Sequence, residues 1–267
     1  MGIPDNIKGL ILDMDGVLWR DTQALLDMPR FFTELKAIGL PVVFATNNGT
    51  RSIEMYVQRL ADFGVPVEPW QVVNSSIAAA EYLCKEFPQG GPVYVVGETG
   101  VLHALAEQGF ETISDPSTTA DVIAVVAGMD RAMTYEKLAT AALYIRAGKP
   151  FLFTNPDPTF PTPRGLVPGA GALLAFLQAS TSVQPVIIGK PEPYLYRFAM
   201  ERLGTAPSET LAVGDRLDTD ILGGQRAGCP TVLVLSGVTN AEEARRWQPQ
   251  PDLILDNLAD LLPLLTR

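Results

Sequence analysis

Two carboxylates follow the first apolar run of the chain. Residues 7–18 read Ile-Lys-Gly-Leu-Ile-Leu-Asp-Met-Asp-Gly-Val-Leu, so Asp13 and Asp15 stand at the end of a buried strand expected over residues 9–13. Alternate side chains of a strand point the same way, and open α/β sheets keep their reactive groups at the carboxyl ends of strands. Neighbouring like charges are unfavourable unless a cation or a shared proton offsets them. The pair therefore predicts a bound metal ion, and the metal ion predicts a phosphate ligand.

Strand-like and helix-like segments alternate along the chain, which is the pattern of a parallel sheet with crossover helices. The alternation starts afresh at Pro92 and ends in a segment rich in Pro and Gly over residues 154–171. We therefore expect an α/β fold in which a Rossmann-like doubly wound parallel sheet receives an inserted α/β unit. The expected core is discontinuous, residues 1–78 and 187–267, and the expected insertion is residues 79–186. Expected strands lie at 9–13, 41–45, 92–97, 122–127, 151–153, 186–189, 210–213 and 231–235, and expected helices at 25–38, 52–63, 75–87, 99–108, 134–147, 171–179 and 194–203.

Composition narrows the class of protein. The 267 residues are 47% hydrophobic and 19% charged, enough to bury a large core. No apolar run approaches the roughly 18 to 20 residues that cross a bilayer, and the first residues lack the pattern of a signal peptide. We therefore expect a cytoplasmic protein. Cys84 and Cys229 are not spaced as a metal or redox pair and are expected to be buried thiols.

The charge distribution bears on binding partners. The net charge is −10 and no block of Lys or Arg occurs, which argues against a nucleic-acid or anionic-membrane surface. A small anionic substrate stays open, because a bound cation and local amides decide binding inside a pocket. The single histidine, His103, lies in a helix-like stretch far from the acidic residues and is expected to be a surface or packing residue.

Four groups of polar residues stand at the carboxyl ends of expected strands, where a parallel sheet can gather them. Each group alone has an ordinary explanation, since a lone Asp is usually a cap or turn residue and a lone Lys a surface charge. Together they supply the parts of phosphoryl transfer: a nucleophilic carboxylate, a general acid and base, hydrogen-bond donors and a cation. The groups are Asp13 with Asp15, Thr46 with Asn47 and Asn48, Lys190, and Asp215 with Asp218 and Asp220.

In this order along the chain, the four groups resemble the four motifs of the haloacid dehalogenase (HAD) superfamily. Longer strings further resemble its NagD-like branch, which includes 4-nitrophenyl phosphatases, phosphoglycolate phosphatases and pyridoxal phosphatases. These strings are Thr-Asn-Asn-Gly-Thr-Arg-Ser at 46–52, Thr-Asn-Pro-Asp at 154–157, Pro-Gly-Ala-Gly at 168–171, Gly-Lys-Pro at 189–191 and Gly-Asp-Arg-Leu-Asp-Thr-Asp-Ile at 214–221. One departure is Gly49, which stands where many relatives carry Ser.

The resemblance implies a role for each matched acidic residue. Asp13 is implied to be the nucleophile and a ligand of Mg²⁺. Asp15 is implied to be the general acid and base, with its backbone carbonyl on the same metal ion. Asp215 is implied to be the acidic ligand of the last motif, and Asp220 to reach the metal through water or a neighbouring ligand. The role of Asp218 stays open.

The resemblance also implies how a substrate is held. Thr46, Asn47 and Asn48 match the phosphate-binding motif, and Lys190 matches the charge that anchors the nucleophile and the phosphoryl group. Residues 79–186 are implied to form a cap that closes over the core, and relatives often form homodimers through this cap. The segment 154–171 either contacts the substrate or only fixes turns.

The leading hypothesis is an Mg²⁺-dependent phosphomonoesterase that hydrolyses small phosphorylated metabolites through an aspartyl-phosphate on Asp13. A phosphomutase of the same superfamily, or a non-catalytic domain that binds Mg²⁺ and a phosphorylated ligand, stays open. An ion pump would need membrane spans, a dehalogenase has little use for Asp15, and the spacing of the last acidic group lacks the loop of an EF-hand calcium site. Arg51 and Arg216 are expected to pair with nearby acids rather than face phosphate.

Overall fold

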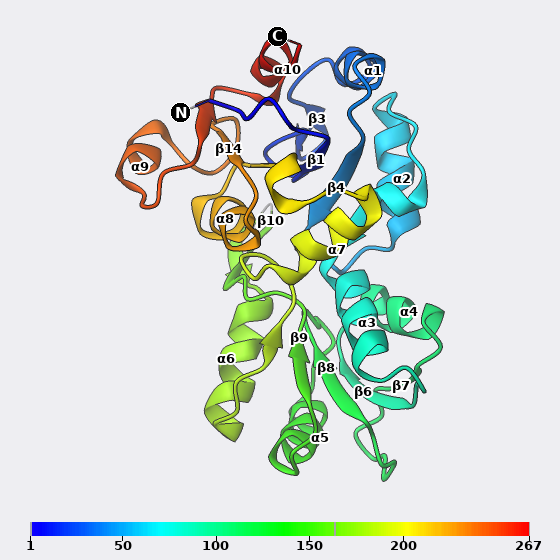
Figure 1. The fold of residues 1–267 in the computed structure, drawn as a ribbon. Helices are drawn as coiled ribbons and strands as arrows, with labels where there is room; N and C mark the ends of the chain where they lie inside the picture. The colour runs from blue at the N-terminus through cyan, green and yellow to red at the C-terminus, as the bar shows by residue number, and fades with distance from the viewer. Residues whose placement is uncertain (1, 163, 267) are drawn as a thin grey trace. The chain divides into compact units, whose positions relative to one another are not determined.

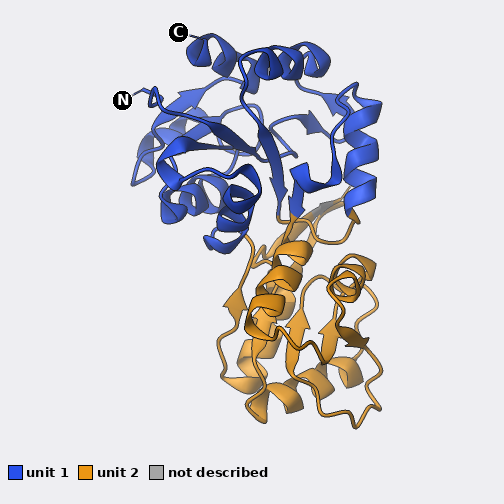
Figure 2. Ribbon diagram, turned by 45° about the vertical axis from the view of Figure 1, so that its right-hand side comes forward, with its two compact units in different colours: residues 1–46, 53–73, 190–267 blue, residues 47–52, 74–189 orange. Residues whose placement is uncertain are grey.

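The computed structural model describes residues 2–162 and 164–266 (Figure 1). The chain folds into two compact units, each with its own sheet (Figure 2). The first unit comprises residues 1–46, 53–73 and 190–267, and the second comprises residues 47–52 and 74–189. The assignment of residues 1–78 and 187–267 to a catalytic core, and of 79–186 to a cap, stays a prediction.

The sheet of the first unit has the strand order β15-β14-β13-β1-β4-β5. All four residues of β1 are buried, as expected for a strand covered on both faces of a parallel sheet. The chain runs from β1 through β4 to β5 on one side and from β13 through β14 to β15 on the other, so the order reverses beside β1. Doubly wound sheets bind ligands at such a reversal. The strands are β1 (Gly9–Leu12), β4 (Val42–Thr46), β5 (Val72–Asn74), β13 (Thr210–Gly214), β14 (Thr231–Val234) and β15 (Leu253–Leu255).

The register of this sheet brings the ends of three strands together. Leu12 lies opposite Val213 of β13 and Phe44 of β4, and both pairings are parallel. The residues just beyond them therefore leave the sheet at one edge. Helix α7 packs against β1 and β4. The helices of the unit are α1 (Met28–Ala37), α2 (Ile53–Asp62), α7 (Tyr194–Leu203), α8 (Leu222–Ala227), α9 (Ala241–Arg246) and α10 (Leu262–Leu265).

Helix α1 illustrates how the sequence sets these elements locally. The Asp27 side chain caps the helix by accepting a hydrogen bond of 3.2 Å from the backbone N–H of Arg30. Buried Met28, Phe31 and Leu35 recur at intervals of three and four residues, so they occupy one face. The predicted helix over 25–38 is thus present, but it begins at Met28, directly after the Asp27 cap.

The second unit contains a smaller parallel sheet with the strand order β12-β9-β8-β6-β7. Helix α5 packs against β6, β8 and α6, and α3 packs against α4. The core contains fully buried Tyr94, Phe153 and Leu177. The strands are β6 (Pro92–Val96), β7 (Glu111–Ile113), β8 (Ala124–Ala127), β9 (Phe151–Phe153) and β12 (Val186–Ile187), and the helices are α3 (Ser75–Glu86), α4 (Thr99–Glu107), α5 (Tyr135–Arg146) and α6 (Ala170–Thr181).

These two sheets confirm the predicted α/β class with parallel sheets flanked by helices. Two hairpins were not predicted. One joins β2 (Trp19–Arg20) to β3 (Gln23–Ala24), and the other, inside the Pro- and Gly-rich segment, joins β10 (Thr159–Thr162) to β11 (Gly165–Pro168). Strands of two to four residues are too short for an alternating pattern, and Pro is tolerated in a two-stranded ribbon, which has only edge strands.

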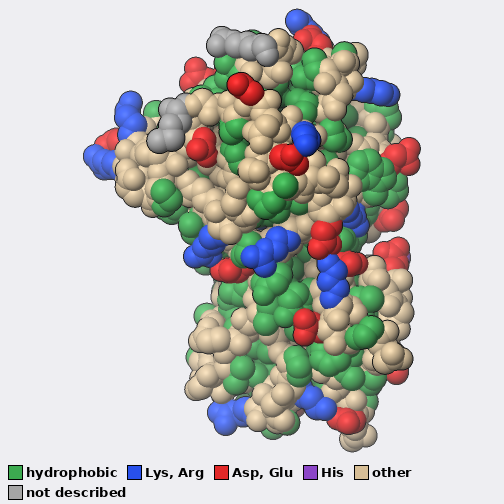
Figure 3. Space-filling model, viewed as in Figure 1, with side chains coloured by type: hydrophobic (Ala, Val, Ile, Leu, Met, Phe, Trp, Pro, Cys, Tyr) green, Lys and Arg blue, Asp and Glu red, His purple; other side chains and the backbone are tan. Residues whose placement is uncertain are grey.

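The surface is mixed in charge. On the face shown in Figure 3, basic and acidic side chains are interspersed among polar and hydrophobic ones. His103 is exposed, with Nδ1 3.7 Å from a carboxylate oxygen of Glu107, as its predicted surface position requires. Cys229 is buried, as predicted, whereas Cys84 is only half-buried. Among the described residues, no helix has both the length and the apolar character that a membrane crossing needs.

Two leucines on helices of the second unit provide a matched test of this core. Leu177 of α6 is 0% exposed and Leu143 of α5 is 68% exposed. We expect Leu177→Ala to lower the free energy of unfolding by about 2–5 kcal/mol, because it removes buried apolar surface and leaves a cavity. Leu143→Ala should change it by less than about 0.5 kcal/mol. Urea denaturation of both variants checks this, and equal losses would contradict the packing described.

Candidate active site

Asp13 is the first residue beyond β1. Its backbone N–H donates to the carbonyl of Val213 at 2.9 Å, which continues the pairing with β13 past the end of the strand. Its Oδ1 accepts a hydrogen bond of 2.7 Å from Nζ of Lys190. The carboxylate that the sequence selected as nucleophile is thus fixed by a strand on one side and by a cation on the other.

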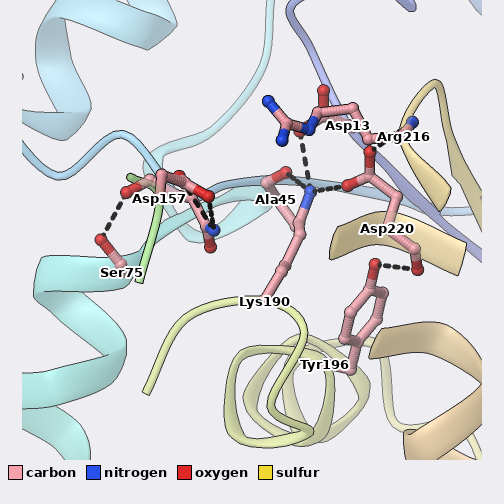
Figure 4. Close-up of polar contacts among 9 residues, drawn as sticks. Asp13, Ala45, Ser75, Asp157, Lys190, Tyr196, Arg216 and Asp220 are labelled. Carbon is pink, nitrogen blue, oxygen red and sulfur yellow. Dashed lines mark hydrogen bonds and ion pairs between the residues drawn. The ribbon is translucent and has the colours of Figure 1, made fainter. Parts of the chain in front are cut away.

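Lys190 is the centre of the polar cluster at this edge of the sheet (Figure 4). The residue is 2% exposed, and its ammonium donates to Oδ1 of Asp13, Oδ1 of Asp220 and the carbonyl of Ala45, each at 2.7 Å. A lysine ammonium has three N–H bonds, so every donor is used. A fully hydrogen-bonded buried cation of this kind has a fixed position and neutralises part of the surrounding negative charge.

The other two acids come from the segment after β13. Asp215 follows the strand directly, and its Oδ2 accepts a hydrogen bond of 2.7 Å from the backbone N–H of Val238. Asp220 lies in a π-helical turn over Leu217–Ile221, where its Oδ2 accepts from the backbone N–H of Arg216 at 3.1 Å. Turns of this type often occur at functional sites. The hydroxyl of Tyr196 donates to the carbonyl of Asp220 at 2.8 Å and so holds the turn in place.

The carboxylates of Asp13, Asp215 and Asp220 form one group whose nearest oxygens all lie within 4.8 Å of one another. Such a set of oxygen donors suits a hard divalent cation such as Mg²⁺. Neighbouring glycines keep this group open, because a Cβ there would overlap the carboxylate of Asp215 or Asp220. They are Gly16, Gly214 and Gly237. The residues present therefore fit a bound divalent cation.

The group is electrostatically unfavourable without a cation. Burial raises the pKa of Asp13 well above its ordinary value; Lys190 lowers that pKa, and Asp220 and Asp215 raise it further. Burial and then Asp220 raise the pKa of Asp215 to about 7. Burial lowers the pKa of Lys190, whereas Asp13, Asp220 and Tyr196 raise it, and the net result lies well above the ordinary pKa of lysine. The lysine therefore stays charged, while the carboxylates compete for protons or a metal ion.

Asp15 lies apart from this group of three carboxylates. Its side chain is exposed, and its Oδ1 accepts a hydrogen bond of 2.8 Å from Nε1 of Trp19. Trp19 was not singled out from the sequence, where it reads as one more apolar residue. The local signal for this contact is the spacing of four residues between Asp15, which lies in a turn, and Trp19.

The expected phosphate-binding residues begin at the end of β4. Thr46 is the last residue of the strand and is buried. Asn47 belongs to the second unit, where its carbonyl accepts hydrogen bonds from Ser75 Oγ at 2.7 Å and from the Asn155 amide at 2.8 Å. Its side-chain amide donates to the carboxylate of Asp157, 3.2 Å from Oδ2. Asn155 and Asp157, which come from the segment 154–171, therefore contact the expected phosphate-binding motif.

The neighbouring residues anchor the same loop. Oδ1 of Asn48 accepts from the hydroxyl of Thr50 at 2.7 Å, and Ser76 Oγ donates to the carbonyl of Gly49 at 2.9 Å. The N-cap of α3 is Asn74, whose side chain accepts a hydrogen bond of 2.9 Å from the backbone N–H of Ile77. The two serines are thereby left to bind the loop.

Arg216 pairs with Asp218 as the sequence predicted. Its guanidinium donates to both carboxylate oxygens of that residue, at 3.2 and 3.1 Å. The exposed Asp218 therefore pairs with the half-buried Arg216 and lies outside the group formed by the other three acids.

Comparison with known proteins places the chain in a family. A family model described as haloacid dehalogenase-like hydrolase matches residues 10–111, and a second described as HAD-hydrolase-like matches residues 187–261. The chain belongs to the haloacid dehalogenase-like hydrolases, in their NagD-like phosphatase branch. It is an enzyme that hydrolyses phosphoric monoesters.

Two curated relatives align over almost the full chain. The 5'-nucleotidase YutF of Bacillus subtilis is 40% identical over 258 residues, 97% of this chain and 98% of the relative. The acid sugar phosphatase of Staphylococcus aureus is 36% identical over 260 residues, again 97% and 98%. Both alignments therefore span residues of both compact units.

Solved structures show the same fold. A double mutant of the thermostable NPPase from Geobacillus stearothermophilus is 39% identical, with a TM-score of 0.86 over 96% of this chain and 98% of that one. The 4-nitrophenylphosphatase from Thermotoga maritima is 34% identical, with a TM-score of 0.89 over 98% of each chain.

The raised pKa values predict how a cation stabilises the protein. A carboxyl whose pKa is raised on folding stabilises the fold at low pH, and for Asp215 that stabilisation is lost as the pH rises from 3.8 to about 7. Mg²⁺ bound to the ionised carboxylates would offset this loss. We expect MgCl₂ at about 100 times its Kd to stabilise the protein by about 2.7 kcal/mol at pH 8, and by much less at about pH 5.

Thermal denaturation with and without MgCl₂ at the two pH values measures this difference. NaCl at matched ionic strength serves as the control, because general screening does not require a chelating group. An equal rise in Tm at both pH values would contradict the acidic group as the metal site.

Proposed function

We propose that this enzyme is an Mg²⁺-dependent phosphomonoesterase that hydrolyses small phosphorylated metabolites through an aspartyl-phosphate on Asp13. The observation that carries the proposal is the buried ion pair between Lys190 and Asp13, set among two further carboxylates. A carboxylate held by a fixed cation is oriented for attack and shielded from the negative charge of a phosphate ester.

In the first half of the reaction, an oxygen of Asp13 attacks phosphorus and the bond from phosphorus to the ester oxygen breaks. Asp15 gives its proton to the departing alcohol, so the leaving group does not depart as an alkoxide. The acyl-phosphate formed on Asp13 divides one difficult displacement into two easier ones. The exposed position of Asp15 supports a role in exchanging protons with substrate and water.

In the second half, Asp15 takes a proton from water as the water oxygen attacks the phosphorus. The bond from phosphorus to the Asp13 oxygen breaks, which restores the carboxylate and releases inorganic phosphate. Lys190 keeps its charge throughout, because its pKa is raised by the two acids that it contacts. It neutralises the same carboxylate before attack and after hydrolysis.

Asp13 and Asp215 would hold the metal ion, together with the backbone carbonyl of Asp15 that the family resemblance implies, and Asp220 would reach it through water or a neighbouring ligand. Bound Mg²⁺ supplies positive charge that neutralises the transferring phosphoryl group. The phosphate-binding roles of Thr46, Asn47 and Asn48 follow from the same resemblance. Their loop is anchored by hydrogen bonds from Ser75 and Asn155, which supports a fixed set of donors.

The names of the relatives suggest the esters to try. They include a 5'-nucleotidase, an acid sugar phosphatase and 4-nitrophenylphosphatases. We propose small phosphate esters of these kinds as the substrate class. A panel of a nucleoside 5'-monophosphate, a sugar phosphate and 4-nitrophenyl phosphate, with and without Mg²⁺, ranks them by phosphate release.

Asp13→Asn should lower phosphate release with every ester by at least about 10³-fold, because an amide cannot serve as the nucleophile. The fold should persist, since Lys190 keeps the carbonyl of Ala45 and Asp220 as acceptors. Asp121→Asn is the matched control, because that carboxylate is exposed and pairs with Lys149. Steady-state assays on the panel measure both variants.

Retained Mg²⁺-dependent release in Asp13→Asn would remove the nucleophile assignment. If the native enzyme instead moved the phosphoryl group to a second alcohol without free phosphate, a phosphomutase would replace the phosphatase. Analysis of the products by phosphorus NMR separates these two reactions.

Asp15→Asn should lower kcat/KM most strongly for esters with poor leaving groups. Loss of general acid catalysis costs about 10²- to 10⁴-fold where the alcohol must be protonated, and less for 4-nitrophenolate, which departs without a proton. The comparison of kcat/KM for phenyl phosphate and 4-nitrophenyl phosphate measures this difference. Equal losses on the two esters would count against the acid role.

Two broader proposals come from the sequence. The enzyme is cytoplasmic, and it forms a homodimer through residues 79–186. The second is supported by exposed apolar side chains in this range, among them Tyr135 at 74% and Leu166 at 73% exposure. Sedimentation of the native chain beside a variant with both residues changed to Ser tests the dimer.

A further inference from the structure

The hydrogen bond between Asp15 and Trp19 joins two very different environments. Asp15 is exposed, whereas Trp19 is 0% exposed. A surface carboxylate ordinarily moves among several side-chain rotamers. Here Oδ1 is held by the indole N–H at 2.8 Å, so the orientation of an exposed acid is set from inside the core.

The indole itself is held by its surroundings within the first unit. The backbone folds back after β1, so that the N–H of Gly16 donates to the carbonyl of Trp19 at 2.8 Å. The ring stacks on Phe63, with centroids 5.5 Å apart and planes 13° from parallel. The guanidinium carbon of Arg59 lies over the ring, 4.3 Å from its centroid, and the same guanidinium donates to the carbonyl of Asp21 in the β2–β3 hairpin. The donor therefore has little freedom to move.

The chemistry of indole suits this position. Its N–H is a donor only, so it can orient a carboxylate without taking up or releasing a proton in the reaction. Because Oδ1 is occupied, Oδ2 is the oxygen left to exchange a proton with the leaving alcohol and with water. We propose that Trp19 is a positioning residue, which holds Asp15 in the orientation for proton transfer; this rests on the acid–base role proposed above for Asp15.

A purely structural explanation is that Asp15 only satisfies a buried N–H, as tryptophans require when they are buried. The two explanations predict different effects of removing the N–H. A structural bond would affect stability, and any loss of activity would be the same for all esters. A positioning bond would affect only the steps in which Asp15 transfers a proton.

Trp19→Phe removes the N–H and keeps an aromatic ring. We expect its kcat/KM to fall about tenfold for phenyl phosphate and less than about threefold for 4-nitrophenyl phosphate, because only the first leaving group needs the proton. In an Asp15→Asn background, the same substitution should change either rate by less than about twofold, because the acid that it positions is already absent.

Trp70→Phe is the matched control, because Trp70 is 44% exposed and has no role in the proposed chemistry. It should leave both rates unchanged. Arg59→Met is a second variant for the case in which Trp19→Phe does not fold. It keeps the indole N–H but loosens the ring, and it should give the same selective loss on phenyl phosphate with a smaller magnitude.

Equal losses on the two esters in Trp19→Phe, or an undiminished loss in the Asp15→Asn background, would overturn the positioning role. Asp15→Asn alone reports separately on the proposed function. If that single variant shows no preference between the esters, the acid–base role fails, and the role of Trp19 fails with it.

Discussion

The arrangement of this active site depends on one buried ammonium group. Lys190 contacts Asp13 and Asp220 with equal bonds of 2.7 Å, although it lies 177 residues from the first in the sequence. Without this cation, the carboxylates at the sheet edge would be too unfavourable to keep buried and ionised. With it, they are close enough to share a divalent cation, while Asp13, the proposed nucleophile, keeps a fixed orientation.

The fold provides this cluster by the reversal of strand order beside β1. Asp13 leaves the sheet on β1 and Asp215 on the adjacent β13, and the parallel pairing directs both to the same edge. Glycines around the cluster are part of the same requirement, because a side chain at Gly16 or Gly237 would occupy the space of the Asp215 carboxylate. The parallel pairing therefore brings the carboxylates to one edge, and the glycines leave the space that these carboxylates occupy.

Hydrogen bonds from neighbouring residues then determine the orientation of the candidate site residues. Tyr196 holds the turn that carries Asp220, and Trp19 holds Asp15 from the core. In the second unit, Ser75 and Asn155 hold the carbonyl of Asn47. Each of these contacts joins a residue of a predicted motif to one outside the four motifs, so those motifs did not single out the supporting residue.

The sequence by itself determined the alternation of strands and helices, the parallel sheet and the acids and lysine at strand ends, because apolar runs and the residues that end them are local features. It did not determine the β2–β3 and β10–β11 hairpins, whose strands are too short to show a period. Only the tertiary structure decided that Asp220 lies within the acidic group while Asp218 pairs with Arg216, and that Asn155, 108 residues away, binds Asn47. The physical reason is that a hydrogen bond depends on distance in space, and the chain sets that distance only after its sheets have paired and packed.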